Sequence, residues 1–128
     1  MAEALADASA IVDLLLGNDL GMAVRRRLAG HALHAPAHLD AEVLSALGRL
    51  HRAGDLGADD VESKLRGLVA APITRHPATG LLLGAWARRH QLRLVDGLYG
   101  QLADSSGLPL MTTDRRLHAA PSVDVVVG

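Results

Sequence analysis

Apolar residues recur along this chain with two spacings, one typical of helices and one typical of short buried strands. The helical spacing is clearest over residues 37–53, where one face carries Leu39, Val43, Leu47 and Leu50. At 100° per residue these side chains fall within roughly 80° of one another. The pattern therefore predicts a helix with one buried face.

The same spacing predicts five further helices, over residues 11–16, 20–29, 61–70, 79–90 and 96–104. Short apolar segments between them predict strands over residues 4–7, 32–35, 72–75, 108–112 and 123–127. In the helix over 79–90 we expect Leu82, Leu83 and Trp86 to face inward. Strands and helices that alternate in this order predict an α/β fold, with helices covering both faces of a central, mainly parallel sheet.

Length and composition favour a single domain over residues 1–128, because a chain of this size buries about two thirds of its surface in one core. The absence of cysteine excludes disulfide bonds, thiolate zinc sites and a cysteine nucleophile. The longest apolar stretch, residues 81–87, is far short of the roughly 20 residues that span a membrane. We therefore expect a soluble, cytoplasmic protein without membrane contact.

The formal charge of −1 at first argues against a polyanionic partner such as nucleic acid. It balances 14 acidic against 13 basic residues, so four acids gathered in one pocket would leave about +3 on the remaining surface. All basic residues but Lys64 are arginine, whose planar fork suits phosphate oxygens, although a GC-rich genome explains the same bias. With Trp86 and Tyr99 as its only aromatic residues, the chain lacks a base-stacking platform.

Three aspartates stand where an apolar segment gives way to a helix. Asp7 follows the first strand, Asp96 follows residues 92–95, and Asp114 follows the strand over 108–112. The carboxyl ends of parallel strands share one rim of a sheet, so these acids can meet in one crevice. An isolated aspartate before a helix is more often an N-cap, and each of the three is open to that simpler interpretation.

Glu42 is the fourth candidate acid. It lies beside the apolar stripe of the helix over 37–53, on the side of Ala46. A carboxylate at such an edge reaches over core surface into a neighbouring cleft, whereas a solvated glutamate needs no such position.

A zinc site is the competing interpretation for the histidines of the N-terminal half. His31, His34 and His38 lie close together in sequence, but Pro36 interrupts them and no His-Glu-x-x-His pattern is present. The spacing therefore favours other roles for these side chains, and His51, His76, His90 and His118 are expected at the surface.

Taken together, these acids and their surroundings resemble the PIN-domain ribonuclease toxins of the VapC type, over essentially the whole chain. The segments that carry the resemblance are Asp7-Ala8-Ser9-Ala10 with the apolar run through Leu16, Ala41-Glu42-Val43-Leu44-Ser45-Ala46-Leu47, Asp96-Gly97-Leu98-Tyr99 and Leu110-Met111-Thr112-Thr113-Asp114-Arg115-Arg116-Leu117. The first strand, which lacks β-branched residues, and Gly97 and Gly100 depart from the family pattern. The two glycines indicate either close packing or local looseness.

The resemblance implies a three-layer α/β/α PIN-like fold and a metal-dependent endoribonuclease, the toxin of a type II toxin–antitoxin pair. It implies that Asp7, Glu42, Asp96 and Asp114 form one acidic pocket. Asp7, Asp96 and Asp114 would hold Mg²⁺, with Mn²⁺ as a substitute, and Glu42 would orient the pocket or the attacking water. Physical chemistry agrees, because ionised carboxylates in one pocket repel one another and call for a hard cation.

The resemblance also implies partners. They are an RNA substrate, a small VapB-like antitoxin whose tail covers the pocket, and a second copy of the chain in a homodimer. Thr113 matches a position usually held by a small polar residue, and we expect it to hydrogen-bond a carboxylate or a water.

Two non-enzymatic alternatives stay open. The first is an inactive relative that keeps the fold only to bind a partner, against which the presence of all four acids argues. The second is a phospho-accepting receiver domain, which has a similar size and an acidic Mg²⁺ pocket. A receiver domain needs adjacent acids after the first strand and a lysine at a late strand end, whereas Asp7 stands alone and Lys64 lies within a predicted helix.

Overall fold

The computed structural model describes residues 2–117 and 123–125, and its elements alternate as the sequence predicts. The strands in this part of the chain are β1 (Ala2–Ala6), β2 (His31–Pro36), β3 (Ile73–His76), β4 (Leu110–Thr112) and β5 (Val123–Val125). The α-helices are α1 (Ala8–Leu16), α2 (Asp19–Leu28), α3 (Leu39–Arg52), α4 (Ala58–Ala70), α5 (Leu82–Ala87) and α6 (Leu94–Ser106). Two short 3-10 helices are η1 (Ala78–Leu81) and η2 (Arg115–Leu117). None of the helices described is long and apolar enough to cross a membrane.

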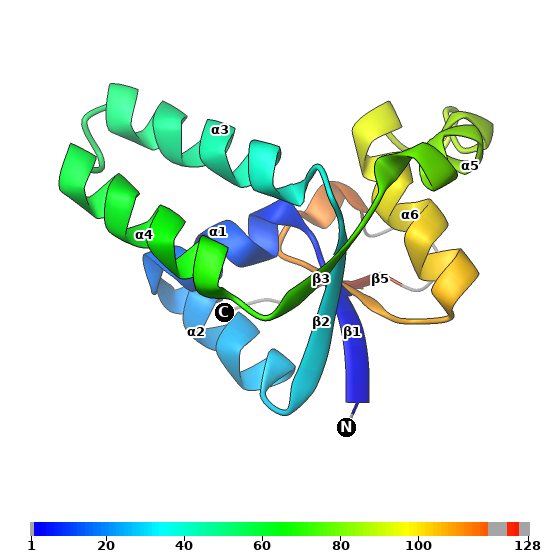
Figure 1. Cartoon of the computed structure of the whole chain (residues 1–128), viewed down its shortest axis with the longest axis horizontal. Helices are drawn as coiled ribbons and strands as arrows, with labels where there is room; N and C mark the ends of the chain where they lie inside the picture. Colours follow the sequence, from blue (N-terminus) through cyan, green and yellow to red (C-terminus); the bar gives the residue numbers. More distant parts are fainter. Residues whose placement is uncertain (1, 118–122, 126–128) are drawn as a thin grey trace.

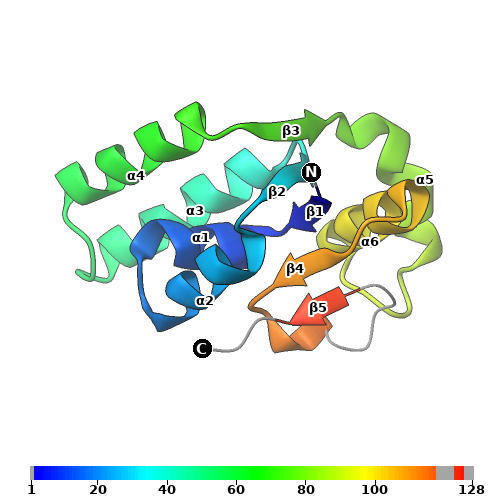
Figure 2. The ribbon, with the colours of Figure 1, turned by 90° about the horizontal axis from the view of Figure 1, so that it is seen from below.

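The strands form one sheet in the order β3-β2-β1-β4-β5, and every described pair runs parallel. Helices α1 to α4 lie on one side of the sheet, and α5 and α6 lie on the other (Figures 1 and 2). The predicted three-layer α/β/α arrangement is confirmed. The strand predicted over 123–127 is described from Val123 to Val125, and its final two positions and His118 lie outside the described residues.

The central strand β1 is built from small residues. Ala4, Leu5 and Ala6 are buried between the helical layers, so this strand needs no β-branched side chains to exclude water. On α3, Leu39 and Val43 are fully buried, as the helical stripe predicts. The sheet and α3 thus share one core, and the polar end of β1 emerges beside it.

Local capping determines where the first two helices begin and end. Asp7 caps α1 by accepting a hydrogen bond from the Ala10 N–H, so the capping role that the sequence offers for this aspartate is confirmed. Gly17 ends α1 with φ 68°, a left-handed conformation that favours glycine. Asn18 then caps α2 through the Gly21 N–H. The turn that the sequence marks between these helices is confirmed.

The helix predicted over 79–90 is wrong in length and in its buried face. The chain forms η1 first and then the short α5, because Pro77 fixes the entry and the tighter 3-10 turn changes the angular phase of the residues that follow. Leu83 is 86% exposed, and Leu82 and Trp86 are also exposed. The buried apolar residues here are Leu81 and Ala85.

Candidate active site

One pocket at the carboxyl ends of β1 and β4 gathers the acids that the sequence singles out. Its volume is about 460 Å³. Asp7 reaches it from the end of β1, and Asp114 from the segment between β4 and η2. Glu42 comes from the first turn of α3 and Asp96 from the first turn of α6. Four segments that are far apart in sequence therefore supply one carboxylate each.

The parallel pairing of β1 with β4 brings Asp7 and Asp114 to the same rim. Ala6 lies opposite Met111, and the Asp7 N–H donates to the Met111 carbonyl oxygen at 3.2 Å. Thr112 therefore lies beside Asp7, and Asp114 follows two residues later. The shared rim that the order of strands and helices predicts is confirmed.

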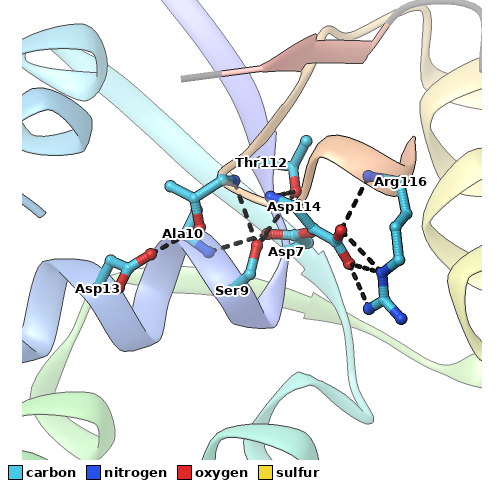
Figure 3. A network of polar contacts seen from close by, with 8 residues as sticks. Asp7, Ser9, Ala10, Asp13, Thr112, Asp114 and Arg116 are labelled. Carbon is cyan, nitrogen blue, oxygen red and sulfur yellow. Dashed lines mark hydrogen bonds and ion pairs between the residues drawn. The ribbon is translucent and has the colours of Figure 1, made fainter. Parts of the chain in front are cut away.

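The Asp7 carboxylate is buried and held by three donors (Figure 3). The Ser9 hydroxyl and the Ala10 N–H donate to Oδ1 at 2.8 and 2.9 Å, and the Thr112 hydroxyl donates to Oδ2. Burial outweighs these hydrogen bonds and raises the pKa of Asp7 from 3.8 to about 6. An ionised Asp7 is thus stabilised by any positive charge brought into the pocket.

Ser9 and Thr112 also hold the backbone that carries Asp114. The Thr113 N–H donates to Ser9 Oγ at 3.2 Å, and the Asp114 N–H donates to Thr112 Oγ1 at 2.9 Å. Sequence reasoning missed both hydroxyls, although each lies within two residues of a candidate acid. They fix the relative positions of the two aspartates.

A fifth carboxylate, that of Asp13, also lines the pocket and was missed in the sequence. The Thr113 hydroxyl donates to Asp13 Oδ2 at 2.7 Å, so the expected contact between Thr113 and a carboxylate is confirmed. Asn18 donates to the other oxygen at 2.9 Å. Asp13 lies two turns into α1 on the face of Ser9, which is the signal that helical spacing offered.

Glu42 is positioned by Tyr99, another residue that sequence reasoning did not assign to the site. The Tyr99 hydroxyl donates to Glu42 Oε1 at 2.7 Å. His38 Nε2 lies 3.1 Å from the same oxygen, and its ring packs against Tyr99 with centroids 4.9 Å apart. Burial, together with the negative charge of Glu42, raises the pKa of Tyr99. The phenol therefore stays protonated and remains a donor to Glu42.

Asp96 and Asp114 differ in their supply of positive charge. Burial raises the pKa of Asp96, and the negative charges of Asp114 and Glu42 raise it further. The pKa of Asp114 is lowered, chiefly by its hydrogen bonds with Arg116. Arg116 Nε lies 3.0 Å from Oδ1 of Asp114, and Nη2 lies 2.6 Å from Oδ2. The chain thus supplies a counter-ion directly to Asp114.

The four predicted acids offer the donor chemistry of a hard divalent cation. Carboxylate oxygens are the ligands that Mg²⁺ and Mn²⁺ prefer. As they stand, no three histidine or acidic side chains among residues 2–117 and 123–125 converge closely enough to hold an ion. The guanidinium of Arg116 meanwhile engages both oxygens of Asp114. The donor set fits a cation in its chemistry, and Arg116 supplies positive charge at one of the acids.

The histidines considered for zinc make other contacts. His34 bridges neighbouring strands, with Nδ1 2.9 Å from His76 Nε2 and Nε2 2.9 Å from Glu3 Oε1. His38 lies beside Glu42, as described above. His76, expected at the surface, is half-buried on β3. These pairs tie β1, β2 and β3 together on one face of the sheet.

Comparison with known proteins assigns the chain to a family. Residues 4–122 match the PIN domain. "Ribonuclease VapC3" of Mycobacterium tuberculosis is 54% identical over 126 residues, which cover 97% of this chain and 92% of that protein. "Ribonuclease VapC12" of the same organism is 36% identical over 111 residues, covering 87% and 86%. The chain therefore belongs to the PIN-domain family and, within it, to the VapC proteins.

Solved structures agree on the fold. The crystal structure of PAE2754 from Pyrobaculum aerophilum superposes with a TM-score of 0.68 at 27% identity, over 97% of this chain and 84% of the other. A toxin–antitoxin complex from Klebsiella pneumoniae shares the fold with a TM-score of 0.63 at 16% identity, over 95% and 96%. The receiver-domain alternative is wrong, and Lys64 lies within α4 rather than at a strand end.

Proposed function

We propose that this chain is a metal-dependent endoribonuclease, the toxin of a type II toxin–antitoxin pair, built as one domain over residues 1–128. The convergence of Asp7, Glu42, Asp96 and Asp114 on one pocket is the observation that carries the proposal. Carboxyl groups with perturbed pKa values in a cleft are characteristic of functional sites. The ribonuclease names of the VapC relatives support the reaction class.

Asp7, Asp96 and Asp114 are the residues that would hold the ion, which we take to be Mg²⁺ with Mn²⁺ as a substitute. When bound, such an ion supplies Lewis-acid chemistry, acidifying a water and offsetting charge on the phosphate. The burial that raises the pKa of Asp7 and of Asp96 also limits screening by water, so both carboxylates gain from a nearby positive charge. Ser9 and Thr112 keep Asp7 in one orientation, so that little rearrangement is needed on binding.

Glu42 acts on the attacking water in this proposal. Its Oε1 accepts the Tyr99 hydroxyl at 2.7 Å, which fixes the carboxylate without protonating it. A water hydrogen-bonded to Glu42 can pass its proton to this group as it attacks phosphorus. The bond between phosphorus and the leaving oxygen of the RNA breaks as the new phosphorus–oxygen bond forms, and the leaving oxygen takes up a proton from water, which completes hydrolysis of the phosphodiester.

Two arginines beside the acids support an RNA substrate. Arg49 and Arg116 both line the pocket, and Arg49 is steadied by a hydrogen bond of 2.9 Å to Ser45. Guanidinium groups bind phosphate oxygens through their planar fork. Such contacts position an RNA strand without reading its sequence, so they serve any RNA class.

We further propose that the chain forms a homodimer through the surface of α5 and the start of α6. Five large apolar side chains are exposed there, and they are Leu82, Leu83, Trp86, Leu94 and Val95. A second copy would remove this surface from water. Light scattering after size exclusion should give twice the monomer mass for the parent protein and a monomer for Leu83→Glu. A monomeric parent protein would contradict the dimer.

A small VapB-like antitoxin and a cytoplasmic location complete the proposal. The VapC relatives support the antitoxin, because they place the chain in the family of such toxins. Co-expression with a candidate VapB-like protein, followed by purification through a tag on one protein only, tests the pairing. A cytoplasmic enzyme would have free access to cellular RNA.

The decisive test is cleavage of a total RNA pool by the purified protein in Mg²⁺, in Mn²⁺ and in EDTA. Asp7→Asn and Asp96→Asn proteins are compared with Asp59→Asn, which alters an exposed acid of α4 away from the pocket. We expect discrete fragments only with metal, from the parent and Asp59→Asn proteins. Equal cleavage by Asp7→Asn or Asp96→Asn would overturn the site assignment. Absence of both cleavage and metal binding would favour the inactive partner-binding module.

A further inference from the structure

The Arg116–Asp114 ion pair places positive charge from the chain on one of the proposed metal ligands (Figure 3). The backbone N–H of Arg116 donates to Asp114 Oδ1 at 2.9 Å. Nε of its side chain lies 3.0 Å from Oδ1 and 3.1 Å from Oδ2, and Nη2 lies 2.6 Å from Oδ2. Both carboxylate oxygens are therefore engaged by the guanidinium, which is the bidentate geometry of strong arginine–carboxylate pairs.

The charge of Arg116 acts on a second acid of the pocket as well. It lowers the pKa of Asp96 against the larger effects of burial and of the neighbouring acids. Asp114 and Asp96 in turn both raise the pKa of Arg116. The guanidinium thus acts on both acids, as a cation shared by Asp96 and Asp114 would do.

The two partners of the ion pair differ in how firmly they are held. The Asp114 side chain is 18% exposed, and its backbone is tied to Thr112. The Arg116 side chain is 60% exposed, so little packing is lost when it turns into solvent. Exposure to water lowers the net stability of even a bidentate pair, so this pair can open more readily than a buried one. If the pair opens, the guanidinium moves and the carboxylate stays.

We propose that Arg116 is an exchangeable counter-ion, which neutralises Asp114 in the ion-free protein and moves to a phosphate of the RNA when a divalent cation binds. This inference rests on the proposed function. The cation and the guanidinium compete for the same Asp114 oxygens, so binding of one weakens binding of the other. The fork that matches a carboxylate also matches a phosphate, so the released side chain has a second partner at the pocket rim.

The first test measures metal affinity, with Mn²⁺ alone as the probe. Isothermal titration calorimetry compares the parent protein with Arg116→Gln and Arg115→Gln. Arg115 is exposed and adjacent, so its variant controls for the loss of one positive charge in η2. We expect Arg116→Gln to bind Mn²⁺ several-fold more tightly than both other proteins, because the competing group is gone. In proteins that already carry Asp114→Asn, the Arg116→Gln change should no longer raise the affinity for Mn²⁺.

The second test measures RNA affinity in a background that does not cut, for which we use Glu42→Gln. A fluorescent single-stranded RNA of mixed sequence is titrated in Mn²⁺. Arg116→Gln should weaken its binding several-fold more than Arg115→Gln does, and the difference should shrink without Mn²⁺, when Arg116 stays on Asp114. Equal weakening by the two variants would contradict the phosphate contact.

These outcomes separate the two proposals. If the parent protein binds Mn²⁺ and cuts RNA while Arg116→Gln has the Mn²⁺ affinity of Arg115→Gln, the exchange is wrong and the nuclease stands. If Mn²⁺ binds to none of the proteins, the metal-dependent nuclease fails and the exchange fails with it.

Discussion

The Tyr99 hydroxyl donates a hydrogen bond of 2.7 Å to Glu42 Oε1, which ties α6 to α3 at the acidic pocket. Tyr99 is 1% exposed, so packing fixes the direction of its phenol. Asp7 is held in the same manner by the hydroxyls of Ser9 and Thr112. Two of the mutually repelling carboxylates, those of Glu42 and Asp7, are thus kept in place by neutral donors.

Tyr99→Phe removes the donor to Glu42 and keeps the buried ring. We expect the free energy of unfolding to fall by about 1 kcal/mol, the typical contribution of one such hydrogen bond, because Glu42 is partly exposed and water can replace the hydroxyl. RNA cleavage should fall more than stability does, since Glu42 loses its orientation. Urea unfolding and cleavage assays of Tyr99→Phe, Glu42→Gln and the double variant measure the coupling. Additive effects of the two changes would show that the bond does not position Glu42.

Asp7→Asn should change how stability depends on pH. The folded-state pKa of Asp7, about 6, lies above its ordinary value of 3.8, so the folded protein binds a proton more readily than the unfolded chain. The contribution of this group to stability is therefore greatest below about pH 4 and is lost as the pH rises from about 4 through about 6. The loss amounts to about 3 kcal/mol for this group. The asparagine keeps a capping oxygen and carries no charge.

Urea unfolding near pH 4 and near pH 8 checks this expectation. Asp7→Asn should be more stable than the parent protein at the higher pH and similar to it at the lower pH. Asp59→Asn, on exposed surface, should follow the parent protein at both. A difference between parent and Asp7→Asn that does not change with pH would show that burial of the ionised carboxylate is not the cause.

Adding Mg²⁺ or Mn²⁺ should raise the melting temperature, and more so near pH 8 than near pH 5. The ion needs ionised ligands, and the pKa of Asp7 near 6 keeps this group protonated at the lower pH. A cation at 100 times its dissociation constant stabilises the fold by about 2.7 kcal/mol, which is a shift of several degrees. Thermal denaturation of the parent, Asp96→Asn and Asp59→Asn proteins, with and without the ion, measures the rise in melting temperature. Asp96→Asn should lose most of this rise, and Asp59→Asn should keep it. A rise independent of pH would exclude Asp7 as a ligand.

Gly97→Ala should destabilise the protein although alanine favours helices. A Cβ at Gly97 would lie 3.0 Å from the Ala85 carbonyl oxygen and 3.1 Å from its Cα, so the backbone of α5 would have to shift by a few tenths of an ångström. Overpacking of this kind costs about 1 to 3 kcal/mol, against a gain of up to about 1 kcal/mol in helix propensity. The departure from the family pattern at this position thus reflects close packing.

Gly48→Ala is the matched control for that substitution. Gly48 lies within α3, where a Cβ would meet Arg52 Nη1 at the ordinary distance of 3.7 Å. It should therefore stabilise the protein by up to about 1 kcal/mol. Urea unfolding gives the free energy of unfolding of both variants relative to the parent protein. Stabilisation by Gly97→Ala would contradict the close contact of α6 with α5.

Sequence pattern alone predicted the layered parallel fold and marked four candidate acids, and the family resemblance implied that these acids share one pocket. The stripe on α3 and the cap at Asp7 are local, since residues one helical turn apart decide them. The alternation of strands and helices then requires parallel strands, and parallel strands place Asp7 and Asp114 on one rim. The roles of these acids in catalysis and metal binding stay predictions.

The same local reasoning failed in the helix predicted over 79–90, where a single 3-10 turn changes which side of the helix the following residues face. The helix predicted over 79–90 assumed one regular period, and the 3-10 turn of η1 put Leu83 in solvent and Leu81 in the core. Apolar spacing does not distinguish these arrangements, because both place apolar residues about one turn apart. Only packing against α6 decides which residues are buried.

Only the tertiary structure decided how the acids are held and charged. The Thr112 hydroxyl meets Asp7 across 105 positions of sequence, and Tyr99 meets Glu42 across 57. Such pairs depend on strand register and helix packing, which the whole core determines together. The sequence determined which carboxylates this protein brings to one rim. The three-dimensional packing determined their burial, and with it the raised pKa of Asp7 and the position of Arg116 on Asp114.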